Sequence, residues 1–267
     1  MRWRVGMRNA GLALLMCLAA WPAGAARSDL LLAYDVRYGG ITVMKVEARL
    51  DLAAGSDRSY AIALEGRTVG LLNTLKPITF TATSKGFSSE AGFQPAFYAT
   101  TTVKRDKRKG LTIAFAPGGT PVTQFTPADD AEELPPAELL EGSVDPASAF
   151  LELARSVAES AACSGTAGVF DGKRRYDVIF TSLPRETLQK TSHSPYAGET
   201  KRCRIKMRPL HGFKPGKPRP LDGTELWFAE VLSGAPPLPV RIETEISLGA
   251  VRLELTSARW AEQQASR

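Results

Sequence analysis

The chain has 267 residues, of which 43% are hydrophobic and 23% charged, and it carries a formal net charge of +6. These proportions exclude a fibrous or disordered protein, and no stretch reaches the roughly 18 to 20 apolar residues of a membrane-spanning helix. The 23 glycines and 18 prolines are spread along the chain, a distribution that favours short elements and tight turns over a helical bundle.

The N-terminal segment has the pattern of an export signal. Three arginines precede an apolar core at residues 10–21, and Ala23-Gly24-Ala25 then forms a small-x-small cleavage site. A buried N-terminal helix is the alternative for this segment. We predict a signal peptide at residues 1–25, so that residues 26–267 form a single β-rich domain that is exported from the cytosol.

Residues 30–125 show the alternation of apolar and polar side chains that is typical of strands with one buried face. The phase of this alternation changes by one residue near Met44-Lys45, which predicts a β-bulge. Strands at 97–103 and 111–115 flank residues 106–110, so we expect a hairpin with a strongly basic turn. The first half of the domain is therefore predicted to be an antiparallel sheet.

The chain changes character at residues 127–144, where acidic residues and prolines crowd together without periodicity and predict a surface loop. Asp145 and Pro146 are typical of the N-cap and first position of a helix, which we expect at about residues 146–160. Its apolar face contains Phe150, Leu153 and Val157. We expect the inner face of the sheet to cover this stripe, and a position at the domain edge is the alternative.

Strand patterns resume after the helix, at 169–170, 175–180, 200–207, 225–232, 240–247 and 250–260. Cys163 and Cys203 are the cysteines that remain after cleavage, and an oxidising compartment predicts a disulfide between them. A zinc site or a redox pair is disfavoured, because there is neither a nearby histidine nor a Cys-x-x-Cys spacing. We expect no metal and no cofactor.

Two basic runs form our candidate patch for an anionic partner. They consist of Lys104, Arg105, Lys107, Arg108, Lys109, Lys173, Arg174 and Arg175. A third run lies on the strand that carries Cys203 and contains Lys201, Arg202, Arg204, Lys206 and Arg208. For an exported protein we expect no nucleic acid partner, so anionic lipid head groups or another envelope polymer are the candidates. Alternatively, the runs are solvated tips that discourage edge pairing.

The sequence contains little that could support catalysis. His193 and His211 both have loop contexts, and there is no Gly-x-Ser-x-Gly motif. Glu243 and Glu245 could act as paired glycosidase carboxylates, but cross-strand pairing with Arg252 is the simpler interpretation. We therefore name no catalytic residue and do not expect an enzyme. An envelope hydrolase is the least favoured alternative.

Three motifs occur together with the spaced cysteines. They are Phe170-Asp171-Gly172-Lys173-Arg174-Arg175-Tyr176-Asp177, Asp145-Pro146-Ala147-Ser148-Ala149 and Tyr38-Gly39-Gly40-Ile41. With these motifs the chain resembles the bacterial exported family called domain of unknown function 3108. The resemblance implies a periplasmic protein of Gram-negative bacteria with a long curved antiparallel sheet around a helix, similar to periplasmic lipoprotein carriers. It implies no established activity and no catalytic residues.

We therefore predict a mainly β fold, a half-barrel or β-spiral whose long antiparallel sheet wraps around one central helix. The interior of such a fold is either a packed core or a hydrophobic trough with the helix as a plug. A trough predicts a non-catalytic protein that binds a lipid-like or other hydrophobic component of the cell envelope. A packed core predicts a structural or interaction protein that supports envelope integrity.

Overall fold

The computed structural model describes residues 29–52, 58–128, 133–160, 162–214, 219, 221–246 and 249–261. The predicted signal peptide, residues 1–25, and residues 129–132 of the predicted acidic loop lie outside this part of the chain. Among the residues that the structure describes, no helix has the length and apolar character needed to cross a membrane.

Within the described ranges, 13 strands form one open antiparallel sheet, which confirms the prediction of a mainly β fold. The strands of the first half are β1 (Leu30–Tyr38), β2 (Ile41–Leu52), β3 (Ser59–Thr68), β4 (Ile78–Ser89), β5 (Gly92–Lys104), β6 (Lys107–Ala114) and β7 (Val122–Thr126). Those of the second half are β8 (Ser164–Phe170), β9 (Arg175–Leu188), β10 (Gly198–His211), β11 (Glu225–Ala229), β12 (Leu238–Ile246) and β13 (Gly249–Trp260). The helices are α1 (Gly70–Leu75), α2 (Ala137–Leu140) and α3 (Pro146–Ser160).

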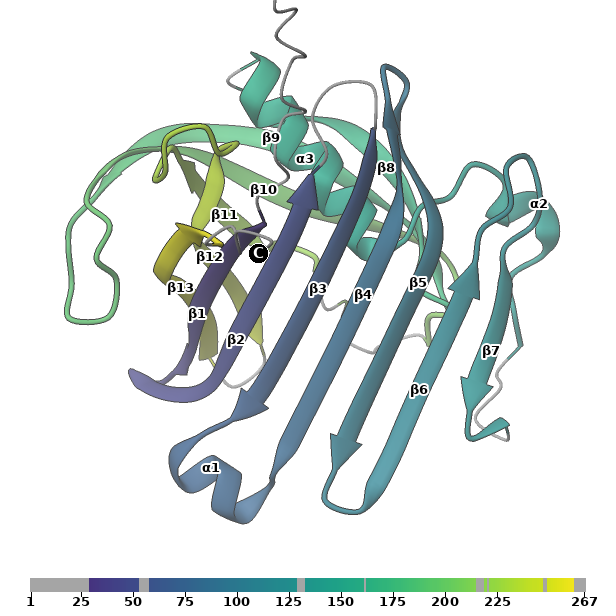
Figure 1. Cartoon of the computed structure of the whole chain (residues 1–267), viewed down its shortest axis with the longest axis horizontal. Coiled ribbons are helices and arrows are strands. Elements are labelled where there is room, and N and C mark those ends of the chain that lie inside the picture. Colours follow the sequence, from purple (N-terminus) through teal and green to yellow (C-terminus); the bar gives the residue numbers. More distant parts are fainter. Residues whose placement is uncertain are drawn as a thin grey trace, which may run out of the picture.

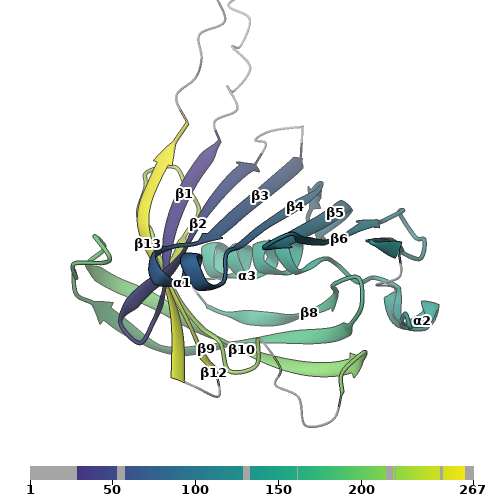
Figure 2. The same ribbon diagram turned by 90° about the horizontal axis from the view of Figure 1, so that it is seen from below.

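The order of the strands across the sheet is β7-β6-β5-β4-β3-β2-β1-β13-β12-β11-β10-β9-β8. The first and last strands of the domain, β1 and β13, therefore pair in the middle of the sheet, and β7 and β8 are its edges (Figure 1). The sheet bends so strongly that α3 lies between the strands of the first half and those of the second (Figure 2).

Strand β1 shows why the alternation predicts the sheet. Its residues Leu30, Leu32, Tyr34 and Val36 are buried on the inner face, because successive side chains of a strand point to opposite sides. The register against β2 shifts after Val36, where Val43 is the extra residue. The predicted bulge therefore exists, one residue before the predicted position.

The basic hairpin differs from the prediction. Its turn is Arg105-Asp106, and residues 107–110, expected in the turn, belong to β6. Lys104 pairs with Lys107, and Arg105 takes a positive φ of 56°. A two-residue turn of this kind matches the twist of the flanking strands, so the ladder continues to the end of the hairpin. The predicted loop at 127–144 likewise contains the short helix α2.

The helix α3 begins at the predicted cap. Asp145 Oδ1 accepts hydrogen bonds from the backbone N–H groups of Ala147 (2.8 Å) and Ser148 (3.2 Å). Its Oδ2 accepts hydrogen bonds from the hydroxyl of Ser84 on β4 (2.9 Å) and from that of Ser148. Tyr60 of β3 completes the network, with its hydroxyl 2.6 Å from Ser148 Oγ. These buried contacts hold the start of α3 against the first half of the sheet.

The predicted apolar face of α3 packs against the second half of the sheet. Leu153 and Val157 are fully buried in a cluster with residues of β8 to β11, and the ring of Phe150 stacks on Phe228 with centroids 6.1 Å apart. This side of the helix is therefore packed core rather than an open trough.

Candidate functional site: a cleft beside α3

A cleft of about 1040 Å³ opens between α3 and two separate parts of the sheet. One wall is the beginning of β5 with the connection after β6, and the opposite wall is the edge strand β8. The last residue of α2 and the segment after it, residues 140–144, close one end, and the second half of α3 forms the floor. This volume slightly exceeds the range of pockets that hold small ligands, roughly 300 to 1,000 Å³.

The two walls differ in chemistry. Aromatic rings line the wall on the side of the first half, where Phe87, Phe93 and Phe115 stand beside prolines and alanines. The wall formed by β8 consists of small residues, Ser164-Gly165-Thr166-Ala167-Gly168. Small side chains leave the backbone of this edge strand accessible, whereas the aromatic rings offer an apolar surface.

The floor of the cleft is polar. Glu152 of α3 accepts a hydrogen bond from the backbone N–H of Phe93, which ties the helix to β5. Arg155 forms an ion pair with Glu152 at 2.7 Å and a longer one with Glu159 at 3.8 Å. The hydrogen bond to Glu152 raises the pKa of the Arg155 guanidinium. The floor thus places two carboxylates beside one guanidinium.

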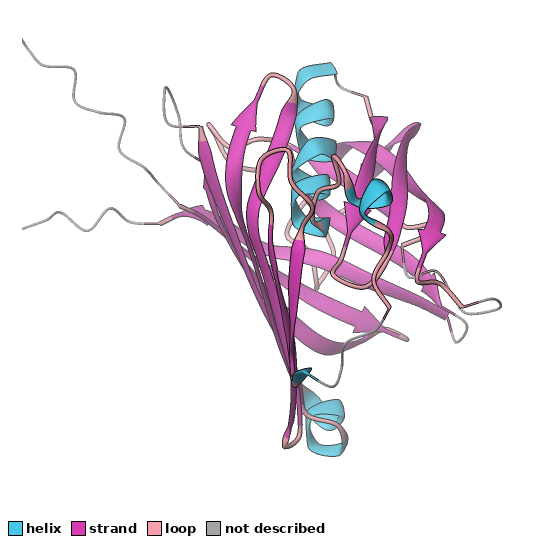
Figure 3. Cartoon of the chain, turned by 90° about the vertical axis from the view of Figure 1, so that its right-hand side faces the viewer, coloured by secondary structure: helices cyan, strands magenta, loops and turns pink. Residues whose placement is uncertain are grey.

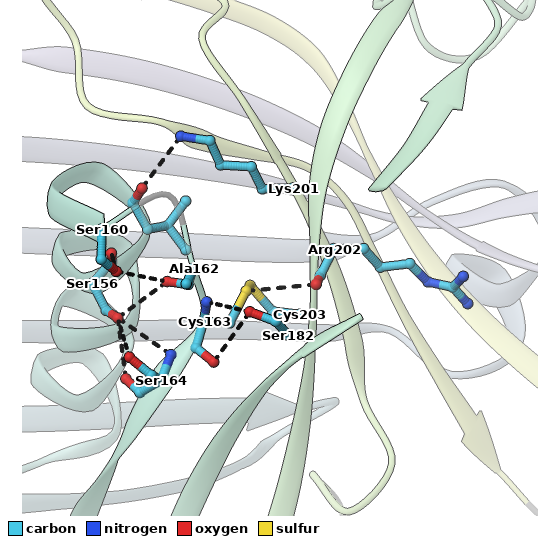
Figure 4. Close-up of a disulfide and its surroundings, with 10 residues drawn as sticks. Ser156, Ser160, Ala162, Cys163, Ser164, Ser182, Lys201, Arg202 and Cys203 are labelled. Carbon is cyan, nitrogen blue, oxygen red and sulfur yellow. Dashed lines mark hydrogen bonds between the residues drawn. A yellow bond between two sulfur atoms is a disulfide. The ribbon is translucent and has the colours of Figure 1, made fainter. Parts of the chain in front are cut away.

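The disulfide between Cys163 and Cys203 holds one side of the cleft in place (Figure 4). The Cα atoms of the two cysteines are 5.5 Å apart, and the bond joins the start of β8 to β10 across β9. The hydroxyl of Ser156 on α3 bonds the carbonyl oxygens of Ala162 (3.2 Å) and Ser164 (3.1 Å). Hydrogen bonds from Ser156 therefore connect the floor to the β8 wall, and the disulfide fixes that wall to β10.

The two basic runs of the candidate patch for an anionic partner differ in their surroundings. In the β5–β6 hairpin, Lys104, Arg105, Lys107, Arg108 and Lys109 are exposed. In the β8–β9 turn, by contrast, the cations make intramolecular contacts. Arg174 pairs with Asp171 at 2.8 Å, Arg175 pairs with Asp177 at 2.7 Å, and Lys173 lies over the ring of Phe125. The hairpin run is therefore the more exposed of the two runs.

The third basic run is part of a charge ladder on the outer face of the second half. Arg202 and Arg204 of β10 both donate hydrogen bonds to Glu225 of β11, and Arg208 pairs with Asp177. Burial alone would raise the pKa of Glu225, but the hydrogen bonds from Arg204 and Arg202 outweigh this effect and lower that pKa. Arg202, Arg204 and Arg208 are therefore partnered within the sheet.

We expect Glu225→Gln to lower the free energy of unfolding by about 1 to 2 kcal/mol at neutral pH, because the charge-assisted bonds to Arg202 and Arg204 are lost. The folded pKa of Glu225 lies below the ordinary value of 4.5, so its ionised form stabilises the fold above that pH. The contribution disappears as the pH falls through the folded pKa. Urea unfolding of both proteins at pH 7 and below pH 4 measures this difference.

The variant Glu65→Gln, at an exposed position of β3, is the control for this experiment. It should unfold like the wild type at both pH values. A difference between Glu225→Gln and the wild type that stays constant down to the lowest pH would contradict the assignment.

The residues considered for a hydrolase, Glu243, Glu245 and His193, do not line the cleft. Glu243 of β12 accepts a hydrogen bond from Arg252 of β13 at 2.7 Å, the cross-strand pair that the sequence favours. It lies on the outer face beside Glu245, and His193 is exposed in the β9–β10 connection. His211 ends β10. Within the described ranges, no three metal-ligating side chains form a group.

The cleft itself could not be predicted from the chain. Its lining comes from segments near residues 90, 118, 142, 156 and 166. Aromatic residues such as Phe93 and Phe115 have the same alternating pattern as residues of the core. The run of small residues in β8 was the available signal, since small residues in a strand indicate a close approach of another group.

Comparison with known proteins places the chain in a family. A profile described as protein of unknown function (DUF3108) matches residues 33–256. No curated protein matches the chain. Among solved structures, a β-barrel-like protein of domain of unknown function DUF1849 from Brucella abortus is similar, with 10% sequence identity and a TM-score of 0.49. That similarity covers 88% of this chain and 99% of the other. The profile match, which spans most of the residues, shows that the chain belongs to the family described as protein of unknown function DUF3108.

Proposed function

We propose that this chain is a non-catalytic periplasmic protein that binds an amphiphilic, lipid-like component of the cell envelope in the cleft beside α3. The observation that carries the proposal is the cleft of about 1040 Å³ with an aromatic wall and a charged floor. Export to the periplasm is supported by the leader pattern at residues 1–25 and by the disulfide, because disulfides persist in oxidising compartments.

The chemistry of the cleft suits a molecule with one apolar and one polar end. An acyl chain or other apolar group would lie against Phe87, Phe93 and Phe115, where burial of apolar area drives binding. A head group would meet Arg155 and the carboxylates of Glu152 and Glu159. Two carboxylates beside one guanidinium favour an uncharged or zwitterionic head group over a strongly anionic one.

The site we propose differs from the trough considered from the sequence. The predicted helix face of Phe150, Leu153 and Val157 packs against β8 to β11 and is not available to a ligand. The ligand would instead lie on the other side of α3, against Arg155 and Glu159.

A second candidate function follows from the edge of the sheet. β8 pairs with β9 on one side. Among the described residues, its other side carries the short parallel bridge of Val144 with Val169 and, at its start, the hydrogen bonds between Ser164 and Ser156. An extended segment of a partner protein could add to this edge, which is a common mode of peptide recognition. In that case the protein would act as a structural or interaction protein of the envelope.

Extraction of bound molecules tests the first proposal. The protein is purified under native conditions from the periplasmic fraction, extracted with organic solvent and analysed by mass spectrometry. We expect an amphiphile in stoichiometric amount. Glu159→Trp places an indole in the cleft at a side chain that is 65% exposed, so we expect it to reduce the extracted amount by about tenfold without unfolding the protein.

The matched control is Glu65→Trp, which places the same side chain on the outer face of β3 and should leave the extracted amount unchanged. An extract of the wild type without an amphiphile would overturn the proposal and favour the second candidate. Equal loss in both tryptophan variants would show that the molecule is not held in the cleft.

A further inference from the structure

The end of the sheet that lies opposite the cleft exposes apolar side chains. Helix α1 connects β3 to β4 there, and it buries none of its six residues (Figures 1 and 3). Leu71 and Leu75 of α1 are 74% and 61% exposed, and Ile41 at the start of β2 is 70% exposed. A single exposed leucine is ordinary in a soluble protein, but three large apolar side chains at one end of a sheet point to an interaction surface.

Backbone contacts bring these residues together. The N–H of Val69, just before α1, donates to the carbonyl oxygen of Val43 at 3.0 Å, so α1 begins beside β2 and close to Ile41. The N–H of Lys76 donates to the carbonyl oxygen of Leu72, which closes the helix. Helix α1, with Leu71 and Leu75, therefore forms a projection at this end of the sheet, beside the start of β2 where Ile41 lies.

The basic hairpin touches the same projection. The N–H of Arg105 donates to the carbonyl oxygen of Pro77 at 3.3 Å, and its guanidinium donates to the carbonyl oxygen of Leu75 at 3.1 Å. The β5–β6 turn thus lies directly against the end of α1. Together with the end of α1, which contributes Lys76, it places five exposed cations at this end, beside one acid of the turn, Asp106. The cations are Lys76, Lys104, Arg105, Lys107 and Arg108.

We infer that this tip surface docks on an anionic phospholipid bilayer. The tip surface consists of Ile41, Leu71, Leu75, Lys76, Lys104, Arg105, Lys107 and Arg108. Its apolar side chains would enter the head-group region, and its cations would contact anionic head groups. This combination of an apolar projection with surrounding positive charge is the one that surface-bound membrane proteins use.

Docking at this end is independent of the proposed ligand in the cleft. β5 has 13 residues and runs from Gly92 at the cleft to Lys104 at the tip surface, roughly 40 Å at the rise of an extended strand. A protein docked through the tip surface would therefore hold its cleft away from the bilayer. Each cation near an anionic membrane contributes roughly a fivefold factor to binding, so charge reversal should have a large effect.

Sedimentation with vesicles tests the inference. The purified protein is mixed with vesicles of phosphatidylglycerol and phosphatidylcholine in equal parts, or of phosphatidylcholine alone. We expect binding to the anionic vesicles that weakens as salt is added. The double variants Lys107→Glu with Arg108→Glu and Leu71→Asp with Leu75→Asp should each bind at least about tenfold more weakly. The wild type and all variants have the same N-terminal sequence, so a difference in vesicle binding between them comes from the substituted residues.

Matched variants at other places are the controls. Lys85→Glu with Lys190→Glu reverses two exposed charges on β4 and in the β9–β10 connection, and Val122→Asp changes a side chain of β7 that is 62% exposed. These proteins should bind vesicles like the wild type. Glu159→Trp should also bind vesicles normally, whereas the tip variants should keep the extracted amphiphile. The two proposals can therefore fail separately.

Two results would overturn the inference. The first is that the wild type does not sediment with the anionic vesicles. A protein partner would then be the remaining candidate for binding the tip surface. The other is equal loss of binding in the tip variants and in the controls. Thermal melting of each variant shows whether it is folded, and the charge reversals at exposed positions should melt like the wild type.

Discussion

Replacing Cys163 and Cys203 together by alanine should lower the free energy of unfolding by about 4 kcal/mol, the largest single effect that we expect in this protein. The disulfide closes a loop of 40 residues, and the chain-entropy argument assigns about this value to a loop of that length. Both sulfur atoms are buried in the core beside α3, so alanine avoids placing a new polar group there. Urea unfolding at equilibrium measures the change.

Reduction of the wild type provides a second measurement of the same effect. Addition of dithiothreitol should shift the unfolding midpoint of the wild type to that of the double alanine variant, and it should not change the variant itself. Loss of the disulfide also releases the start of β8 from β10, so hydrogen exchange of the β8 amides should become faster. A wild-type midpoint that does not respond to reductant would contradict the stabilising role.

Asp145→Ala should have the second largest effect, a loss of about 3 kcal/mol. The substitution removes the N-cap of α3, which is worth about 1 kcal/mol. It also leaves the buried hydroxyls of Ser84 and Ser148 without their carboxylate acceptor, at a further cost of roughly 1 to 3 kcal/mol. Urea unfolding at pH 7 measures the loss, and circular dichroism shows whether α3 is retained.

Asp145→Asn is the informative control. The amide oxygen keeps the cap of α3, and the substitution removes a buried charge, so we expect a loss of about 1 kcal/mol or less.

Burial raises the pKa of Asp145, although hydrogen bonds from Ser148 and Ser84 oppose this effect. A raised folded pKa makes the acid form stabilising below the unfolded value of 3.8, and this contribution is lost as the pH rises through the folded pKa. The wild type should therefore gain stability relative to the asparagine variant as the pH falls through that window. An asparagine variant as unstable as the alanine variant would contradict the cap assignment.

The two proposals assign different tasks to the two ends of one sheet. The end near Gly92 carries the cleft, where Ser156 joins α3 to β8 and the disulfide joins β8 to β10. The other end, near Lys104, carries exposed leucines and cations. Antiparallel pairing keeps every connection at one end or the other, so short changes in the connections can alter one end without disturbing the opposite one.

Much of the architecture could be predicted because its signals are local. The alternation in β1 and the cap residues Asp145 and Pro146 each act within a few residues, and the structure places β1 and α3 at the predicted positions. The turn of the basic hairpin was misplaced because a run of cations gives no local signal for where strand pairing ends. Arg105 accepts a positive φ in that turn, which composition does not indicate for an arginine.

The candidate sites could not be predicted in the same way. The two basic runs have similar compositions but different surroundings. Arg174 and Arg175 pair with nearby aspartates, whereas Lys107 and Arg108 are exposed. Leucines such as Leu71 and Leu75 are usually buried in the core. Here they are exposed, because the connection that contains them extends beyond the sheet. In each case the outcome depends on which distant segment packs against the residue.

By itself, the sequence determined the antiparallel character of the sheet, the position of its longest helix and the family to which the chain belongs. The tertiary structure alone decided that β1 pairs with β13, that the apolar face of α3 is filled by β8 to β11, and that a cleft remains on its other side. The physical reason is the distance along the chain over which each interaction acts. Side-chain periodicity and helix caps act between neighbours along the chain, whereas the curvature of the sheet and the space between its edges arise from contacts between residues far apart in sequence.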